Sequence, residues 1–199
     1  MAKYTMVFFL EDSAQEALIP NLVRRLISDE NRNPQDYELK VLSARGGGSI
    51  RAYKEFVEGV KKYKIPADDV LIVGSDSNCN GFVNRRSQLN AAAKDVPYST
   101  IITAIPDPHI ERWYLLDNKA LANAAGVPVQ AVPLAAKCDK GHYKKLLKDS
   151  FAQHNLSPPL GGAEYGPSIA ATMDLYAAGV ADHSLRDFVD QVRNWLKQH

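Results

Sequence analysis

Cysteine is scarce in this chain, which limits the chemistry available to it. Only Cys79 and Cys138 occur among 199 residues, and they lack the short spacing of a metal-binding pair. We expect both to be reduced thiols of a cytoplasmic protein. No Cys-x-x-Cys, His-Glu-x-x-His or Ser–His–Asp pattern marks another enzyme class.

Long apolar runs and an excess of one charge are also missing. No run approaches the roughly 20 apolar residues that cross a bilayer, so we expect no membrane span. The first residues, which run into Glu11, are expected to form a strand and not a signal peptide. The formal net charge is +1, so a surface for nucleic acid would have to be a local patch.

What the chain does have is an alternation of strands and helices. The apolar run Val70-Leu71-Ile72-Val73 is typical of a strand buried on both faces of a parallel sheet. The pattern predicts an α/β fold, Rossmann-like, with a parallel sheet of about four strands and helices on both faces. The expected strands are 4–10, 37–43, 70–73 and 99–104, and the expected helices are 14–28, 50–62, 83–94, 110–116, 119–125, 143–151, 168–176 and 185–197.

We expect one domain over residues 1–199, in which 1–125 form the α/β core. Residues 126–199 are expected to form a helical C-terminal part packed on that core. Pro20 leaves open a later start, near Ile19, for the first helix.

Acidic side chains follow the predicted strands. Glu11 ends the first strand and Asp76 follows the third, while Asp107 and Glu111 follow the fourth. The carboxyl ends of parallel strands share one edge, so these carboxylates should gather and repel one another unless a cation lies between them. Such hard oxygen ligands suit Mg²⁺ or Mn²⁺, and Asn78 can add a neutral carbonyl.

Helix capping is the alternative role for these acidic residues, because Asp often caps the helix after a strand. We prefer it for Asp12. Asp76 lies in a Gly-Ser-Asp-Ser-Asn loop with no helix directly after it, which favours a functional role, and Glu11 stays open. His109 also stays open, as a general base, a metal ligand or an incidental residue of a proline-flanked turn.

A glycine-rich stretch, Arg45 to Ser49, lies between the second strand and the next helix. Backbone amides at a helix N-terminus favour an anion, and Arg45 adds positive charge. The stretch around Gly47 is neither a Gly-x-Gly-x-x-Gly fingerprint nor a P-loop, so a flexible loop is the alternative.

The densest basic run includes Lys137, Lys140 and Lys144. A solvated face is the default for such lysines. The alternative is a surface that contacts nucleic-acid phosphates. It requires the helix expected over 143–151 to lie beside the acidic edge of the sheet. The same two interpretations, a solvated side chain or a phosphate contact, apply to Arg86, which is next to Arg85.

In their order along the chain, these segments resemble the Toprim domain. That family has a Glu after the first strand and an Asp-x-Asp after a later one. More narrowly, the chain is similar to small stand-alone Toprim-like proteins associated with ABC-type or AAA-type ATPases in bacterial defence loci. The segments that carry the resemblance are 7–12, 45–48, 76–78 with 85–86, 105–117 and 137–147.

The resemblance implies a metal-dependent endonuclease in which carboxylates hold Mg²⁺ or Mn²⁺ beside a DNA or RNA phosphate. Asp76 would be the principal ligand, and Glu11 a second ligand or the general acid/base. Glu111 would complete the catalytic set. Arg86 or Lys137 would neutralise charge in the transition state. An ATPase would be the partner.

One residue departs from the family pattern. Asn78 stands where the second Asp is expected, so the ligands of a metal ion would carry one negative charge fewer. This favours a second hypothesis, a catalytically degenerate subunit that binds an ATPase or nucleic acid. A third hypothesis is a nucleotide-binding α/β enzyme that uses Gly46–Gly48 to bind phosphate.

Glu16 is the alternative to Glu11 as the Glu of the family pattern. We prefer Glu11, because it ends the strand, whereas Glu16 already lies in the predicted helix.

Overall fold

The sheet of the computed structural model is parallel throughout, which confirms the predicted α/β class. The described residues are 4–43, 49–63, 69–94, 96, 98–134, 138–139 and 141–199. Four strands pair in the order β2-β1-β3-β4. They are β1 (Tyr4–Leu10), β2 (Tyr37–Ser43), β3 (Val70–Gly74) and β4 (Thr100–Ala104).

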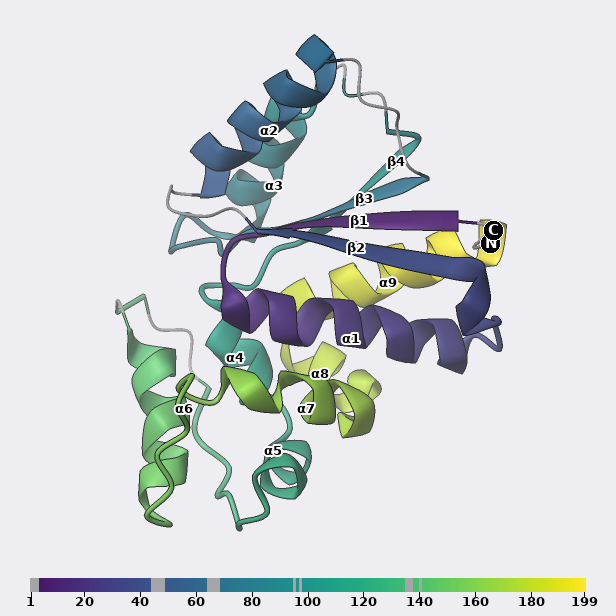
Figure 1. Cartoon of the computed structure of the whole chain (residues 1–199). Helices are drawn as coiled ribbons and strands as arrows, with labels where there is room; N and C mark the ends of the chain where they lie inside the picture. Colours follow the sequence, from purple (N-terminus) through teal and green to yellow (C-terminus); the bar gives the residue numbers. More distant parts are fainter. Residues whose placement is uncertain are drawn as a thin grey trace.

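The direction of strand addition reverses at β1, which has β2 on one side and β3 on the other. Because parallel crossovers are right-handed, this reversal places the helix before it and the helices after it on opposite faces. α1 (Ser13–Asp29) covers one face, and α2 (Ser49–Tyr63) and α3 (Phe82–Ala92) cover the other (Figure 1). Open α/β sheets bind ligands at such a reversal, at the carboxyl ends of the strands.

An apolar core lies on each face of the sheet, and β1 contributes to both. Met6, Phe8 and Leu10 belong to the core on the α1 side, and Val7 and Phe9 to the core under α2 and α3. This alternation follows from the two-residue period of a strand. It explains why β1 is apolar at consecutive positions, as a central strand of a parallel sheet must be.

The remaining helices gather on the α1 side of the sheet (Figure 1). α9 runs beside β4, where the Gln191 side chain accepts the Thr103 N–H (3.2 Å) and donates to the Thr103 carbonyl (3.3 Å). The outer edge of β4 is thereby partly covered. These elements are α4 (Ile110–Tyr114), α5 (Asn118–Ala125), α6 (His142–Ala152), α7 (Gly166–Thr172), α8 (Leu175–Ala181) and α9 (His183–Gln198), with 3₁₀ turns at Pro34–Asp36 and Ala163–Tyr165.

Two of the differences from the predicted helices have a clear physical cause. Asp12 caps α1 by accepting the Gln15 N–H (2.9 Å), so the helix begins at Ser13 and continues through Pro20. The stretch 168–176, predicted as one helix, is split between α7 and α8. Asp174 causes the split, because its side chain accepts backbone N–H groups of α8 and starts a new helix there.

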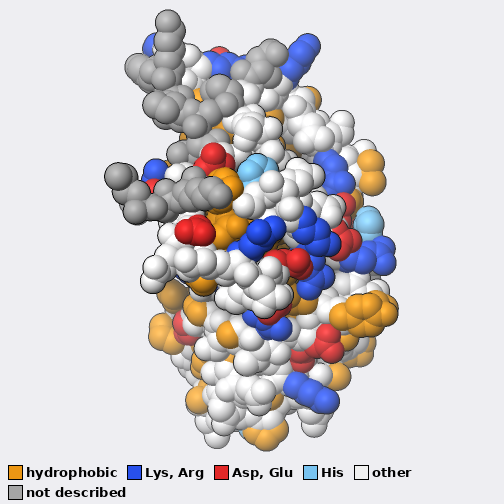
Figure 2. Space-filling view, turned by 90° about the vertical axis from the view of Figure 1, so that its right-hand side faces the viewer, with side chains coloured by type: hydrophobic (Ala, Val, Ile, Leu, Met, Phe, Trp, Pro, Cys, Tyr) orange, Lys and Arg blue, Asp and Glu red, His pale blue; other side chains and the backbone are white. Residues whose placement is uncertain are grey.

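None of the helices in the described part of the chain is long and apolar enough to cross a bilayer. Figure 2 views the end of the molecule that lies on the right of Figure 1, where the strands begin. Basic and acidic side chains are interspersed over the coloured part of that surface.

Candidate active site

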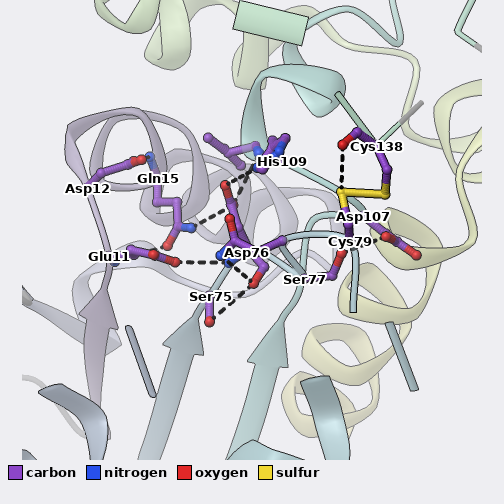
Figure 3. Close-up of polar contacts among 12 residues, drawn as sticks. Glu11, Asp12, Gln15, Ser75, Asp76, Ser77, Cys79, Asp107, His109 and Cys138 are labelled. Carbon is purple, nitrogen blue, oxygen red and sulfur yellow. Dashed lines mark hydrogen bonds and ion pairs between the residues drawn. A yellow bond between two sulfur atoms is a disulfide. The ribbon is translucent and has the colours of Figure 1, made fainter. Parts of the chain in front are cut away.

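Asp76 lies just beyond the carboxyl end of β3 and is 7% exposed. Its Oδ1 accepts hydrogen bonds from Gln15 Nε2 (3.0 Å) and from the Ile110 backbone N–H (3.2 Å). Its Oδ2 lies 3.2 Å from His109 Nδ1 (Figure 3). The carboxylate is thus held by α1, by the start of α4 and by the residue before α4.

Glu11, at the end of β1, reaches the same loop. Its Oε2 accepts the Asp76 backbone N–H (3.1 Å), and its own N–H donates to Gln15 Oε1 (3.1 Å). Gln15 therefore joins the backbone of Glu11 to the carboxylate of Asp76 (Figure 3). β1 and β3 are neighbours at the reversal of the sheet, so their ends bring the two acidic residues together.

Burial is the main reason why the pKa of Asp76 is raised from 3.8 to about 7. The His109 hydrogen bond lowers this pKa. The charges of Glu11, Asp12 and Glu111 raise it further. The acidic residues that follow β1 and β4 are therefore close enough to act on Asp76, as we expect for side chains at one edge of a parallel sheet.

His109 is not an incidental turn residue, because its ring contacts the central carboxylate. The hydrogen bond to Asp76 is the largest cause of a raised His109 pKa, and burial opposes it. If Nδ1 donates to Asp76, that contact fixes the tautomer and leaves Nε2 to accept a proton. Asp76 and His109 together can orient and stabilise an imidazolium, the arrangement needed for proton transfer.

The basic helix α6 lies beside the acidic edge. A cavity of about 140 Å³ is lined by Asp12 and Glu111 and also by Lys144 of α6. Tyr114 and Leu147 complete part of its wall. This meets the condition under which the sequence favours phosphate contact by Lys144 over a purely solvated role.

The donor chemistry of this edge fits a hard divalent cation. Glu11 and Asp76 supply adjacent carboxylates, and their repulsion is what a cation would relieve. No three His, Cys, Asp or Glu side chains form a metal-binding group within the described residues. Both oxygens of the Asp76 carboxylate have hydrogen-bond partners in the protein. Asn78, the predicted third ligand, is exposed and donates through Nδ2 to the Asp76 backbone carbonyl (3.3 Å).

Arg86 does not contact this loop. It pairs with Asp187 of α9, and its guanidinium lies 4.4 Å from the centre of the Phe82 ring. Arg85 is the neighbour that reaches the loop, because its Nη2 donates to the Ser77 carbonyl (3.3 Å). The other predicted substrate contacts and the predicted catalytic lysine, Arg45, Gly47, Lys137 and Lys140, lie outside the described residues.

Asp107 has a structural role in this arrangement. Its Oδ1 accepts the Ser77 hydroxyl (2.6 Å), and its Oδ2 accepts the Phe82 N–H (3.3 Å) at the start of α3. It therefore ties the loop after β3 to the loop after β4 and accepts the N–H of the first residue of α3.

The prediction of two reduced thiols is wrong, because Cys79 and Cys138 form a disulfide (Figure 3). They are 59 residues apart in the chain, but their Cα atoms are 5.4 Å apart. Spacing along the chain carries no signal of this contact, since α3, β4, α4 and α5 fold between them. The bond attaches the stretch before α6 to the loop that bears Asp76.

Gln15 is the site residue that the sequence interpretation missed. It is fully buried and touches both Glu11 and Asp76. A signal was present, because Asp12-x-x-Gln15 has the spacing of a capping box. In such a box the side chain at the third helical position turns back toward the residues before the helix.

Gly74 provides a test of this arrangement. A Cβ there would lie 2.5 Å from Gln15 Oε1 and 2.7 Å from Leu10 Cδ2. We expect Gly74→Ala to displace Gln15 and to lower the free energy of unfolding by about 1–3 kcal/mol, measured in urea. Gly59→Ala is the control, because a Cβ at Gly59 meets nothing within 4 Å and its helix should gain stability. Equal stability of Gly74→Ala and the wild type would contradict the packing described.

Comparison of the chain with protein-family models, with curated protein sequences and with solved structures finds no match.

Proposed function

We propose that this protein is a metal-dependent endonuclease that hydrolyses phosphodiester bonds of DNA or RNA. The observation that carries the proposal is the crowding of acidic side chains at this edge: the Glu11 carboxylate accepts the N–H of the buried Asp76, and the charges of Glu11, Asp12 and Glu111 raise the pKa of Asp76. Such crowding is unfavourable in the absence of a cation. Lys144, which lines the same small cavity as Glu111, adds a positive charge for a phosphate.

Glu11 and Asp76 would hold Mg²⁺ or Mn²⁺. When bound, the ion polarises the phosphate and lowers the pKa of a water molecule. Gln15 and the Ile110 N–H orient Asp76, and the Asp76 N–H orients Glu11. His109 accepts the proton of the attacking water at Nε2, and Asp76 stabilises the resulting imidazolium through Nδ1.

The Toprim resemblance supports the same proposal from the sequence. Its Glu and its Asp-x-Asp correspond here to the ends of two neighbouring strands, β1 and β3. We therefore also propose, as that resemblance implies, a cytoplasmic protein that works with an ABC-type or AAA-type ATPase. Disulfides are rare in the cytoplasm, so the bond between Cys79 and Cys138 argues against the cytoplasmic part of this proposal.

A second candidate is a non-catalytic subunit that binds an ATPase or nucleic acid. Two observations favour it: both Asp76 oxygens already have hydrogen-bond partners, and Asn78 brings no negative charge. It predicts no cleavage with any divalent metal, even when the partner is present.

The test is cleavage of plasmid DNA, single-stranded DNA and total tRNA with Mg²⁺, Mn²⁺ or chelator. We expect metal-dependent cleavage by the wild type and a loss of at least about 100-fold in Asp76→Asn. Asp190→Asn is the matched control, because Asp190 is an exposed carboxylate of α9. Thermal unfolding gives an independent readout: Mn²⁺ should raise the melting temperature of the wild type and of Asp190→Asn, but not that of Asp76→Asn.

Cleavage by Asp76→Asn at the wild-type rate would contradict the assignment of the site. No cleavage of any substrate by the wild type, with metal and with the ATPase, would contradict the endonuclease and favour the second candidate, which requires binding of the ATPase or of nucleic acid.

A further inference from the structure

A groove between α2 and α3 lies on the face of the sheet opposite α1 (Figure 1). Its volume is about 480 Å³. No Asp or Glu among the described residues lines it. The lining side chains are apolar, amide or basic: Ile50, Lys54, Arg85, Gln88, Ala91 and Ala92.

Arg85 is the unusual member of this groove, since it is only 6% exposed. Nη1 donates to Gln88 Oε1 (3.2 Å) and Nη2 to the Ser77 carbonyl (3.3 Å), both uncharged acceptors. Its buried Nε has no hydrogen-bond partner among the residues that the structure describes. Across the described ranges, neither Arg85 nor Lys54 forms an ion pair with a carboxylate.

A guanidinium removed from water is normally paired with an anion, because desolvation of an unpaired charge is costly. Arginine matches phosphate in particular, since its planar donors meet two oxygens at once. We propose that the groove between α2 and α3 binds a phosphate group carried by a nucleoside, with Arg85 as the central contact and Lys54 as the second cation.

The rest of the groove suits the remainder of such a ligand. Ile50, Ala91 and Ala92 offer a small apolar surface for a base or sugar, and Gln88 places an amide beside Arg85. The phosphate belongs either to a free nucleotide or to a nucleic-acid strand. Arg85 also holds the Ser77 carbonyl, one residue after Asp76, so the groove and the candidate active site share a loop.

Binding is measured by calorimetry with ATP, with inorganic phosphate and with a short thymidine oligonucleotide. Chelator is present throughout, so the result does not depend on the proposed metal site. For whichever probe binds the wild type, Lys54→Ala should weaken the affinity by about tenfold or more. Ala91→Glu, which places a carboxylate in the groove, should abolish binding of that probe. Arg51→Ala is the matched control on the same helix, because the Arg51 side chain is 84% exposed and outside the groove. All three variants alter exposed positions, and their folding is checked by circular dichroism.

Tighter binding of ATP than of the oligonucleotide, lost in Ala91→Glu, supports the site and identifies a free nucleotide as its ligand. Tighter binding of the oligonucleotide, lost in the same variant, supports the site and identifies a strand. The inference is overturned if no probe binds the wild type at millimolar concentration. It is also overturned if Arg51→Ala weakens binding as much as Lys54→Ala.

Discussion

Replacement of Asp76 by asparagine should make the metal-free protein more stable at pH 8. The pKa of this carboxyl is raised from 3.8 to about 7, first by burial and then by neighbouring carboxylates. A shift of this size corresponds to about 4 kcal/mol of destabilisation by the ionised form. Asparagine removes the charge, and its Oδ1 can still accept from Gln15 and from the Ile110 N–H.

The pH dependence has a definite sign. Between about pH 4 and pH 7 the folded protein keeps a proton on Asp76 that the unfolded chain has lost, so wild-type stability falls as pH rises. The raised pKa of His109 acts in the same direction, because its stabilisation is lost as pH rises through the folded pKa. The gain from Asp76→Asn should therefore be largest at pH 8 and close to zero near pH 4.

Urea unfolding in chelator at pH 4, 6 and 8 measures this difference. Asp190→Asn, the same replacement at an exposed site, should show no such pH-dependent gain. The prediction would be contradicted if Asp76→Asn were less stable than the wild type at pH 8. Hydrogen bonds would then outweigh the cost of burying the ionised carboxylate in the free energy of unfolding.

Replacement of Asp182 by alanine should lower the free energy of unfolding by about 3–5 kcal/mol, because it leaves a buried charge unpaired. Asp182 is 4% exposed. Its Oδ2 accepts from Arg112 Nε (2.6 Å), and its Oδ1 accepts the Ser184 and Leu185 N–H groups (2.9 and 3.1 Å) that begin α9. Arg112 also donates to the Tyr143 hydroxyl of α6 (3.1 Å), so one ion pair connects α4, α6 and α9.

Asp174→Ala is the control for the capping part of this effect. Asp174 caps α8 in the same way but is exposed, and its loss should cost about 1 kcal/mol. The double variant Asp182→Asn with Arg112→Met, which keeps a cap and removes the cation, should recover part of the stability. Equal losses in Asp182→Ala and Asp174→Ala in urea unfolding would show that the ion pair contributes nothing.

The sheet could be predicted because its signals are local. Val70 to Val73 is apolar at every position since both faces of the strand are covered, and an acidic residue after each of two strands must lie at the shared edge of a parallel sheet. The meeting of Glu11 with Asp76 follows from these two facts. The start of α1 was harder to place, because Pro20 argues against a helix that the Asp12 cap and the apolar stripe stabilise.

The rest of the site depends on contacts between distant parts of the chain. The sequence cannot tell which of Arg85 and Arg86 reaches the Asp76 loop, because adjacent helical residues point about 100° apart and the helix orientation is set by packing. Arg86 pairs instead with Asp187, which lies 101 residues later in the chain. Cys79 and Cys138 likewise meet only once the intervening elements are in place.

The disulfide also closes residues 79–138 into a covalent ring. The ring contains α3, β4, α4 and α5, and therefore His109 and Glu111 as well. A single proteolytic cut within it leaves both fragments covalently joined until a reductant is added. The carboxylate loop of Asp76 and the lysine helix α6 are attached just outside the two ends of this ring, so their separation is limited by a covalent bond in addition to packing.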